Sequence, residues 1–159
     1  MKTSPSLETT LNLVDALFHG RLDKGGQPIS LHSRRCVGFL PSAAPSTVQK
    51  AMALHDVLED TVLTPASLRD LGYSAYTVKL VEIVTLRDGE SYDDGIARIV
   101  NSGEPWAVIM KLADNQDNTD EARLTLIPSE HQTRLRARYA GVRARLIAAL
   151  PPQCQKTYQ

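Results

Sequence analysis

The sequence of 159 residues has few cysteines and no net charge. Cys36 and Cys154 are its only cysteines, and they form no CxxC motif, which argues against a disulfide scaffold. With 18 basic and 18 acidic residues, no overall field attracts nucleic acid or an anionic membrane. No apolar run reaches the ~18 residues of a transmembrane helix, and the N-terminus lacks the apolar centre of a signal peptide. We therefore expect a soluble cytoplasmic protein with no nucleic-acid and no membrane partner; the pattern does not indicate an oligomeric state.

Several common catalytic motifs are also missing, namely GxGxxG, GxxxxGK[ST], GxSxG and HExxH. What remains is ordinary globular composition, 42% hydrophobic and 23% charged, at a length that suits about one domain of ~150 residues. We find neither period-two alternation nor a hairpin signal. The sequence predicts an all-α fold, with a single helical domain over residues 1–150 and a short polar tail at 151–159.

Apolar residues at helical spacing divide the domain into segments. Ser6, Ser46, Thr64 and Ser74 are the expected helix N-caps, and Pro65 suits the first position of a helix. The β-branched segment after Ser74 could form a strand, but its length and cap favour a helix. We expect one helix over 46–58, a buried element at 105–113 and one long last helix over 135–150.

The densest polar cluster is HDVLED at residues 55–60. On one helix, residues four apart share a face, which would place His55, Asp56, Glu59 and Asp60 together. An imidazole and three carboxylates repel one another unless a cation lies among them, and His with Asp suits a divalent ion. The alternative is a solvated acidic face, which the cluster alone favours.

Two further segments favour the metal site. His32 follows the loop DKGGQPIS, and Asp114 ends the apolar run PWAVIMKLA, where a carboxylate needs a partner. Asn118 lies one turn beyond Asp114 if the helix continues. Taken alone, His32 could bond to the backbone at a helix start, and Asp114 could be a helix cap.

In chain order these residues read His, then His-Asp, then Asp, which is the signature order of the HD phosphohydrolase superfamily. The segments GGQPISLH, ALHDVLEDT, LTPASLRDLGY, VEIVTLRDGESY and MKLADNQDN resemble successive blocks of the hydrolase domain of RelA/SpoT-type alarmone enzymes. They also resemble the small stand-alone alarmone hydrolases. The resemblance covers roughly residues 11–120 and implies a single HD-domain helical bundle.

The resemblance also implies a ligand set and a reaction. His32, His55, Asp56 and Asp114 would bind one divalent ion, Mn²⁺ in this family. Glu59 and Asp60 match the acidic pair that orients or deprotonates water, and Asn118 matches a residue that contacts the nucleotide. The implied reaction removes pyrophosphate from the 3′ position of a guanosine alarmone, which leaves GDP or GTP.

Other charged residues are candidates for the substrate phosphates. Lys111 lies within one helical turn of Asp114, whereas a surface charge is the simpler interpretation of Arg21 and Lys24. Tyr92 could stack on a base or pack in the core. The arginines of the last helix suggest a solvated face rather than a nucleic-acid patch, because aromatic residues do not alternate with them; they are Arg134, Arg136, Arg138, Arg143 and Arg145.

The sequence departs from the family pattern where the base and phosphates are read. Ile29 stands where a tyrosine is expected, Asn115 replaces an arginine and Asp117 replaces a histidine. The metal set is intact, so the departures concern the substrate more than the hydrolysis. A 5′-nucleotidase or phosphodiesterase of the same superfamily, and a non-catalytic module that binds metal or nucleotide, remain the alternatives.

Overall fold

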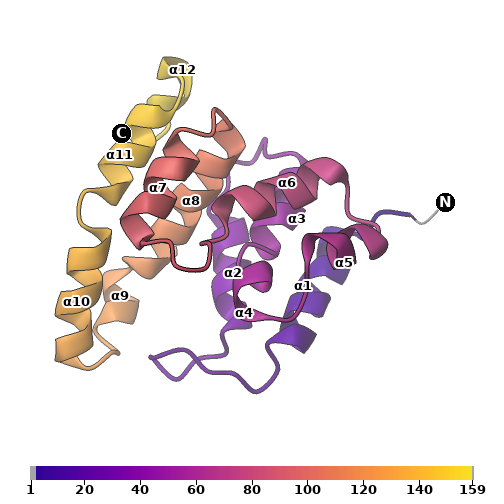
Figure 1. Cartoon of the computed structure of the whole chain (residues 1–159). Helices are drawn as coiled ribbons and strands as arrows, with labels where there is room; N and C mark the ends of the chain where they lie inside the picture. The colour runs from indigo at the N-terminus through magenta and orange to yellow at the C-terminus, as the bar shows by residue number, and fades with distance from the viewer. Residues whose placement is uncertain (1–2, 159) are drawn as a thin grey trace.

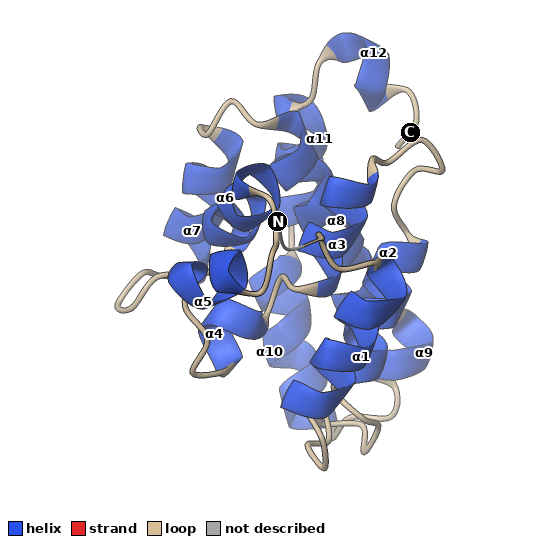
Figure 2. Cartoon of the chain, turned by 90° about the vertical axis from the view of Figure 1, so that its right-hand side faces the viewer, coloured by secondary structure: helices blue, strands red, loops and turns tan. Residues whose placement is uncertain are grey.

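The computed structural model describes residues 3–158, and every regular element in that range is a helix (Figures 1 and 2). This confirms the predicted all-α class. No helix in the described range is long and apolar enough to cross a bilayer. The helices are α1 (Leu7–Leu17), α2 (Ser30–Gly38), α3 (Ser46–Ala53), α4 (Val57–Asp60), α5 (Pro65–Asp70), α6 (Ala75–Val84), α7 (Tyr92–Val100), α8 (Pro105–Asn118), α9 (Glu121–Leu124), α10 (Ser129–Tyr139), α11 (Val142–Ala149) and α12 (Pro152–Gln155).

The helix starts follow the local chemistry of the sequence. The side chains of Ser6, Thr64 and Ser74 each accept a hydrogen bond from a backbone N–H three residues on, and Pro65 occupies the first turn of α5. The β-branched segment after Ser74 is the helix α6, as its cap and length predict. Ser46 does not act as a cap: it lies inside α3, and Pro45 takes the cap position without a side-chain hydrogen bond.

Helices α3 and α8 form the centre of the molecule. Helix α3 packs against α1, α2 and α6, while α8 packs against α2, α6, α7 and α11. Fully buried side chains such as Met52, Leu80, Met110 and Leu112 fill the space between them. Since α2, α3 and α8 carry or flank the predicted metal ligands, the hydrophobic core holds the site elements in place.

Two predicted helices are broken. The segment 46–58 divides into α3 and α4, because a turn with hydrogen bonds between residues three apart covers Leu54 to Asp56. The predicted last helix divides into α10 and α11 at Gly141, whose φ of 73° is a left-handed conformation that suits glycine. After the break, α11 packs on α8, and α10 to α12 lie along one side of the molecule, far from the N-terminus (Figure 1).

The segment predicted as a polar tail is also partly structured. Residues Pro152–Gln155 form α12, and Cys154 and Tyr158 pack against the hydrophobic core. Two consecutive prolines begin the segment, and the second of them takes the first turn of the helix.

Candidate metal centre and adjoining cleft

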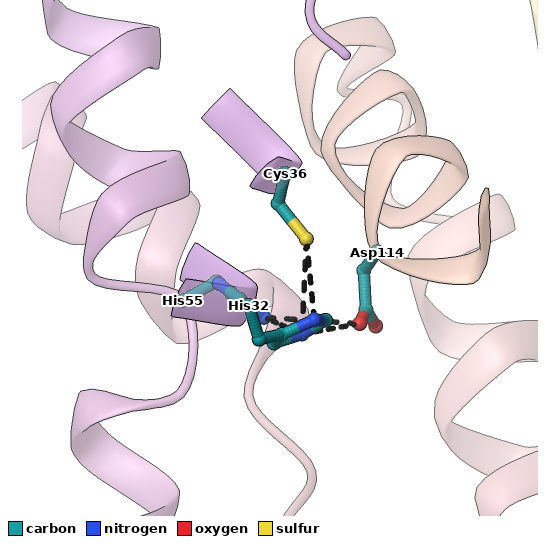
Figure 3. Close-up of side chains that lie close together, drawn as sticks. All are labelled: His32, Cys36, His55 and Asp114. Carbon is teal, nitrogen blue, oxygen red and sulfur yellow. Dashed lines mark hydrogen bonds and ion pairs between the residues drawn. The ribbon is translucent and has the colours of Figure 1, made fainter. Parts of the chain in front are cut away.

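The structure brings the four predicted metal ligands together from three places in the chain. His32 lies on α2, His55 and Asp56 lie in the turn between α3 and α4, and Asp114 lies on α8. The Nε2 atoms of the two histidines are 3.1 Å apart (Figure 3 shows both rings beside Asp114). Asp114 Oδ1 is 3.2 Å from His32 Nε2, and Asp56 Oδ2 is 3.1 Å from His55 Nε2. Donor atoms from distant segments thus converge on one point.

The turn at residues 54–56 changes the geometry expected for HDVLED. On a continuous helix the four polar side chains would share one exposed face. Instead His55 is 5% exposed, whereas Glu59 and Asp60 lie on the exposed side of α4. The turn therefore separates the inward-facing pair His55-Asp56 from the outer acidic pair.

The second nitrogen of each imidazole has a fixed partner. His55 Nδ1–H donates to the carbonyl oxygen of Met52 at 2.8 Å, and His32 Nδ1–H donates to Asp117 Oδ2 at 2.6 Å. Because both partners only accept, each Nδ1 carries a proton, and Nε2 is the nitrogen that faces the cluster and can bind a cation once it is deprotonated. This is the tautomer that a metal-binding histidine needs.

The residues fit a single divalent ion. A cation with bonds of ~2.1 Å has neighbouring ligand atoms about 3.0–3.4 Å apart in octahedral or tetrahedral geometry. The two Nε2 atoms here lie 3.1 Å apart, and each lies 3.1–3.7 Å from an Asp56 and an Asp114 oxygen. Two imidazole nitrogens and two carboxylate oxygens form a donor set for a divalent metal.

The charges at the site favour bound cations. Burial alone would raise the pKa of Asp114, but the ammonium of Lys111, 2.6 Å away, and the two histidines hold that pKa well below its usual range. Burial would lower the pKa of His55, but the Asp56 carboxylate beside it raises that pKa well above its usual value. The two carboxylates therefore stay ionised in the interior, where a positive partner stabilises them.

Asp117 lies at the site, although the sequence interpretation did not include it among the candidate site residues. It is fully buried, and besides His32 it accepts hydrogen bonds from Arg35 at 2.6 and 3.2 Å and from Arg123. Arg123 also donates to Asp23 at 3.0 Å, in the loop before α2. The family comparison suggested a change in nucleotide reading at this position. The structure places the carboxylate behind His32, within hydrogen-bond distance of its Nδ1.

A signal for this contact was present in the helical spacing. Asp117 is three residues after Asp114, and Arg35 is three residues after His32, so each lies one turn from a ligand. The sequence could not show that α2 and α8 face each other across these turns.

Cys36 joins the cluster from the next turn of α2. Its Sγ atom lies 3.6 Å and 3.7 Å from the two ring nitrogens of His32, which places the sulfur above the ring (Figure 3). One donor atom from each of His32, Cys36, His55 and Asp114 lies within 4.8 Å of the others. Burial, reinforced by the nearby carboxylates, raises the pKa of the thiol, so Cys36 is protonated. The prediction that Cys36 lies in the core is confirmed.

A cavity of about 440 Å³ opens beside the donor atoms. Glu59 lines it and accepts a hydrogen bond from the Leu86 N–H at 3.2 Å. Lys111 and Asn118 also line it; each donates to Asp114 at 2.6 Å. Helix α8 continues to Asn118, so Asp114 is a residue of the helix interior and not a cap.

The remaining candidates lie at different distances from the cavity. Lys24 lines the cavity and a second one of about 270 Å³ next to it. Arg21 and Asp60 line neither cavity: Arg21 lies over the Phe18 ring and donates to the backbone carbonyl of Asp60 at 3.0 Å. Tyr92 lines the first cavity and packs edge-on against Tyr139.

Comparison with known proteins supports the fold. No protein-family model and no curated protein sequence matches the chain. Among solved structures, the chain is similar to a metazoan ortholog of SpoT that is described as hydrolysing ppGpp. The TM-score is 0.68 at 20% identity, over 93% of this chain and 96% of that one. The resemblance seen in the sequence is thus confirmed at the level of the fold, and this chain shares the helical fold of that ortholog.

Proposed function

We propose that this protein is a metal-dependent phosphohydrolase that acts on a nucleotide. The observation that carries the proposal is the set of converging Nε2 and carboxylate atoms of His32, His55, Asp56 and Asp114 at the edge of a large cavity. A divalent ion bound there would lower the pKa of a water molecule and offset the charge of a phosphate.

The side chains around the cavity supply the other functions that hydrolysis needs. Burial, together with the nearby Asp56 carboxylate, raises the pKa of Glu59, which suits a group that takes a proton from water. Lys111 holds its positive charge beside Asp114, because the attraction of that carboxylate outweighs the effect of burial on the pKa of the lysine. Asn118 and Lys24 line the cavity and offer donors to a phosphate or a base.

For the substrate we propose a guanosine alarmone of the ppGpp kind, cleaved at the 3′ position, with Mn²⁺ as the metal. The ordered sequence blocks and the fold shared with the SpoT ortholog support this choice. The residues that depart from the family pattern differ in whether they face the cavity. Ile29 lines the cavity, whereas Asn115 is buried within α8. Asp117 contacts His32, so its substitution concerns the metal site rather than the base.

The test is a turnover screen of the purified chain, stripped of metal and reloaded with Mn²⁺, Mg²⁺ or Zn²⁺. The panel contains ppGpp, GTP, GDP, GMP and a cyclic dinucleotide, with products separated by chromatography. We expect pyrophosphate and GDP from ppGpp with Mn²⁺. Orthophosphate from GMP would instead support a 5′-nucleotidase, and cleavage of the cyclic dinucleotide a phosphodiesterase. No turnover by a chain that binds metal would favour a binding module.

A further inference from the structure

The cleft extends well beyond the metal centre. The cavity of about 440 Å³ lies next to a second one of about 270 Å³, and the two share part of their lining. The residues common to both cavities are Asp23, Lys24, Asn118, Arg123, Arg138 and Tyr139. Three of these six side chains are cationic.

Most cations of the cleft are already neutralised by the protein. Lys111 pairs with Asp114, Arg98 pairs with Glu90, and Arg123 pairs with Asp23 and Asp117. Within residues 3–158, the structure shows no ion pair for Arg138 or Lys24. These two charges are therefore the ones that an anionic ligand in the cleft would meet without displacing a protein carboxylate.

Arg138 packs against two aromatic rings, although the described residues give it no carboxylate partner. Its guanidinium carbon lies 4.4 Å from the centre of the Tyr92 ring and 5.9 Å from that of Tyr139. Stacking uses the face of a guanidinium and leaves the N–H groups at its edge free to donate. An arginine ordered in this way loses less conformational entropy when it binds an anion.

The neighbouring arginine on α10 shows what an ordinary surface charge looks like here. Arg136, two residues earlier, forms an ion pair with Glu121 and lines neither cavity. Arg138 is exposed, as expected for a solvated face, but it also lines both cavities and so belongs to the wall of the cleft.

Building on the proposed function, we propose that Arg138 binds a phosphate group of the nucleotide other than the one bound at the metal centre. The fork of an arginine matches two oxygens of a phosphate, and such charge-assisted bonds are the strong ones. The preferred substrate then has two separate anionic groups, one near His32 and Asp114 and one near Arg138 and Lys24. A base stacked on the guanidinium is the competing occupant, and the experiment must separate the two.

The experiment measures binding without turnover. Calorimetry on the full chain, stripped of metal, compares GDP with guanosine as probes. The variants are Arg138→Met, Arg138→Lys and the matched control Arg136→Met on the same helix. We expect the wild type to bind GDP more tightly than guanosine. Arg138→Met should weaken GDP binding about 10–100-fold, as expected for a charged hydrogen-bond pair, and leave guanosine binding unchanged. Arg138→Lys should lose less, and Arg136→Met should match the wild type.

Three results would overturn the proposal. If Arg138→Met weakens the binding of GDP and guanosine equally, the arginine stacks on the base. If Arg136→Met weakens GDP binding as much as Arg138→Met does, the effect is one of general charge, and if the wild type binds GDP no more tightly than guanosine, no phosphate subsite is present. Because no hydrolysis is measured, the result is independent of the turnover screen. If the chain hydrolyses a nucleotide but does not prefer GDP over guanosine, only the proposed role of Arg138 is contradicted. If the chain prefers GDP but hydrolyses no nucleotide, only the proposed hydrolase function is contradicted.

Discussion

The charged side chains at the two ends of the cleft differ in burial and in their partners. The metal end is the cluster around Asp114, and the cation end is the pair Arg138 and Lys24. At the metal end, Asp114, Asp117 and His55 are buried, and each is bound by several protein groups. At the other end, Arg138 and Lys24 are exposed, and neither has a carboxylate partner within the described part of the chain. A buried charge needs a partner of opposite charge within the fold, whereas an exposed charge is stabilised by water and stays available to a ligand. The candidate metal end is therefore preorganised, and we expect the cation end to distinguish one substrate from another.

The largest expected effect is at the metal end. Asp56→Ala removes a donor atom that lies 3.1 Å from His55 Nε2, and we expect metal binding and turnover to be lost. Asp56 lies in a turn outside the helices, so the far-UV circular dichroism should match that of the wild type. Calorimetric titration with Mn²⁺ checks the first point. Tight metal binding by the variant would contradict the assigned ligand set.

Glu59 should affect the rate and leave metal binding intact. Glu59→Gln keeps the size of the side chain but cannot take a proton, so we expect turnover to fall about 10²–10⁴-fold. Asp60→Asn is the comparison variant. Its carboxylate lies outside both cavities, so its loss should be smaller.

The pH profile gives a second readout of the same residue. Burial and the Asp56 charge raise the pKa of Glu59 above its usual value of 4.5, so the base form is lost at a higher pH than for an exposed glutamate. Activity should decline on the acid side above pH 4.5, and this decline should disappear in Glu59→Gln. Full activity in the double variant Glu59→Gln/Asp60→Asn would exclude the mechanism.

Asp117 tests whether preorganisation matters at the metal end. Asp117→Asn can still accept the His32 Nδ1–H, but it no longer balances Arg35 and Arg123, so the ring should be held less firmly. Loss of such a supporting carboxylate typically costs about 10–100-fold in metal affinity. Competition with a chelator measures the affinity, and nitrogen NMR of the imidazole reports the tautomer. Glu121→Gln, which breaks the exposed pair with Arg136, should leave both unchanged.

The ion pair of Glu90 with Arg98 is partly buried, between the buried metal end and the exposed cation end. We expect the smallest effect for this pair, and it should concern stability. Hydrogen bonds from Arg98, at 2.7 and 2.8 Å, lower the pKa of Glu90 to about 2. A lowered folded pKa means that the pair stabilises the fold above pH 4.5 and that this gain is lost as the pH falls toward 2. Glu90→Gln should lower stability by about 0.2–1 kcal/mol at pH 7. In thermal unfolding, the difference from the wild type should shrink as the pH falls from 4.5 toward 2; a constant difference at all pH values would contradict the assignment.

The sequence predicts the metal end better than the cation end, for a physical reason. Ligand types such as His55-Asp56 and Asp114 are rare at the edge of apolar segments, so their pattern is visible without a structure. The partners of Asp117 and Arg138 come from tertiary contacts, such as the hydrogen bond between Arg35 and Asp117, 82 residues apart. Even within local structure, the break at Gly141 was missed, because Leu135 to Leu150 keep helical spacing across it.

That break at Gly141 has a consequence for the cleft wall. Helix α11 is anchored by buried Val142 and Leu146, whereas α10 has no buried residue at all. The glycine hinge therefore separates a segment that the core constrains from one that it does not. Mutations in Ser129–Tyr139 can accumulate at little cost to folding, even though this segment forms part of the cleft wall. A change of side chains in this one short helix could thus reshape the cleft wall while the buried frame of α2, α3 and α8 stays as it is.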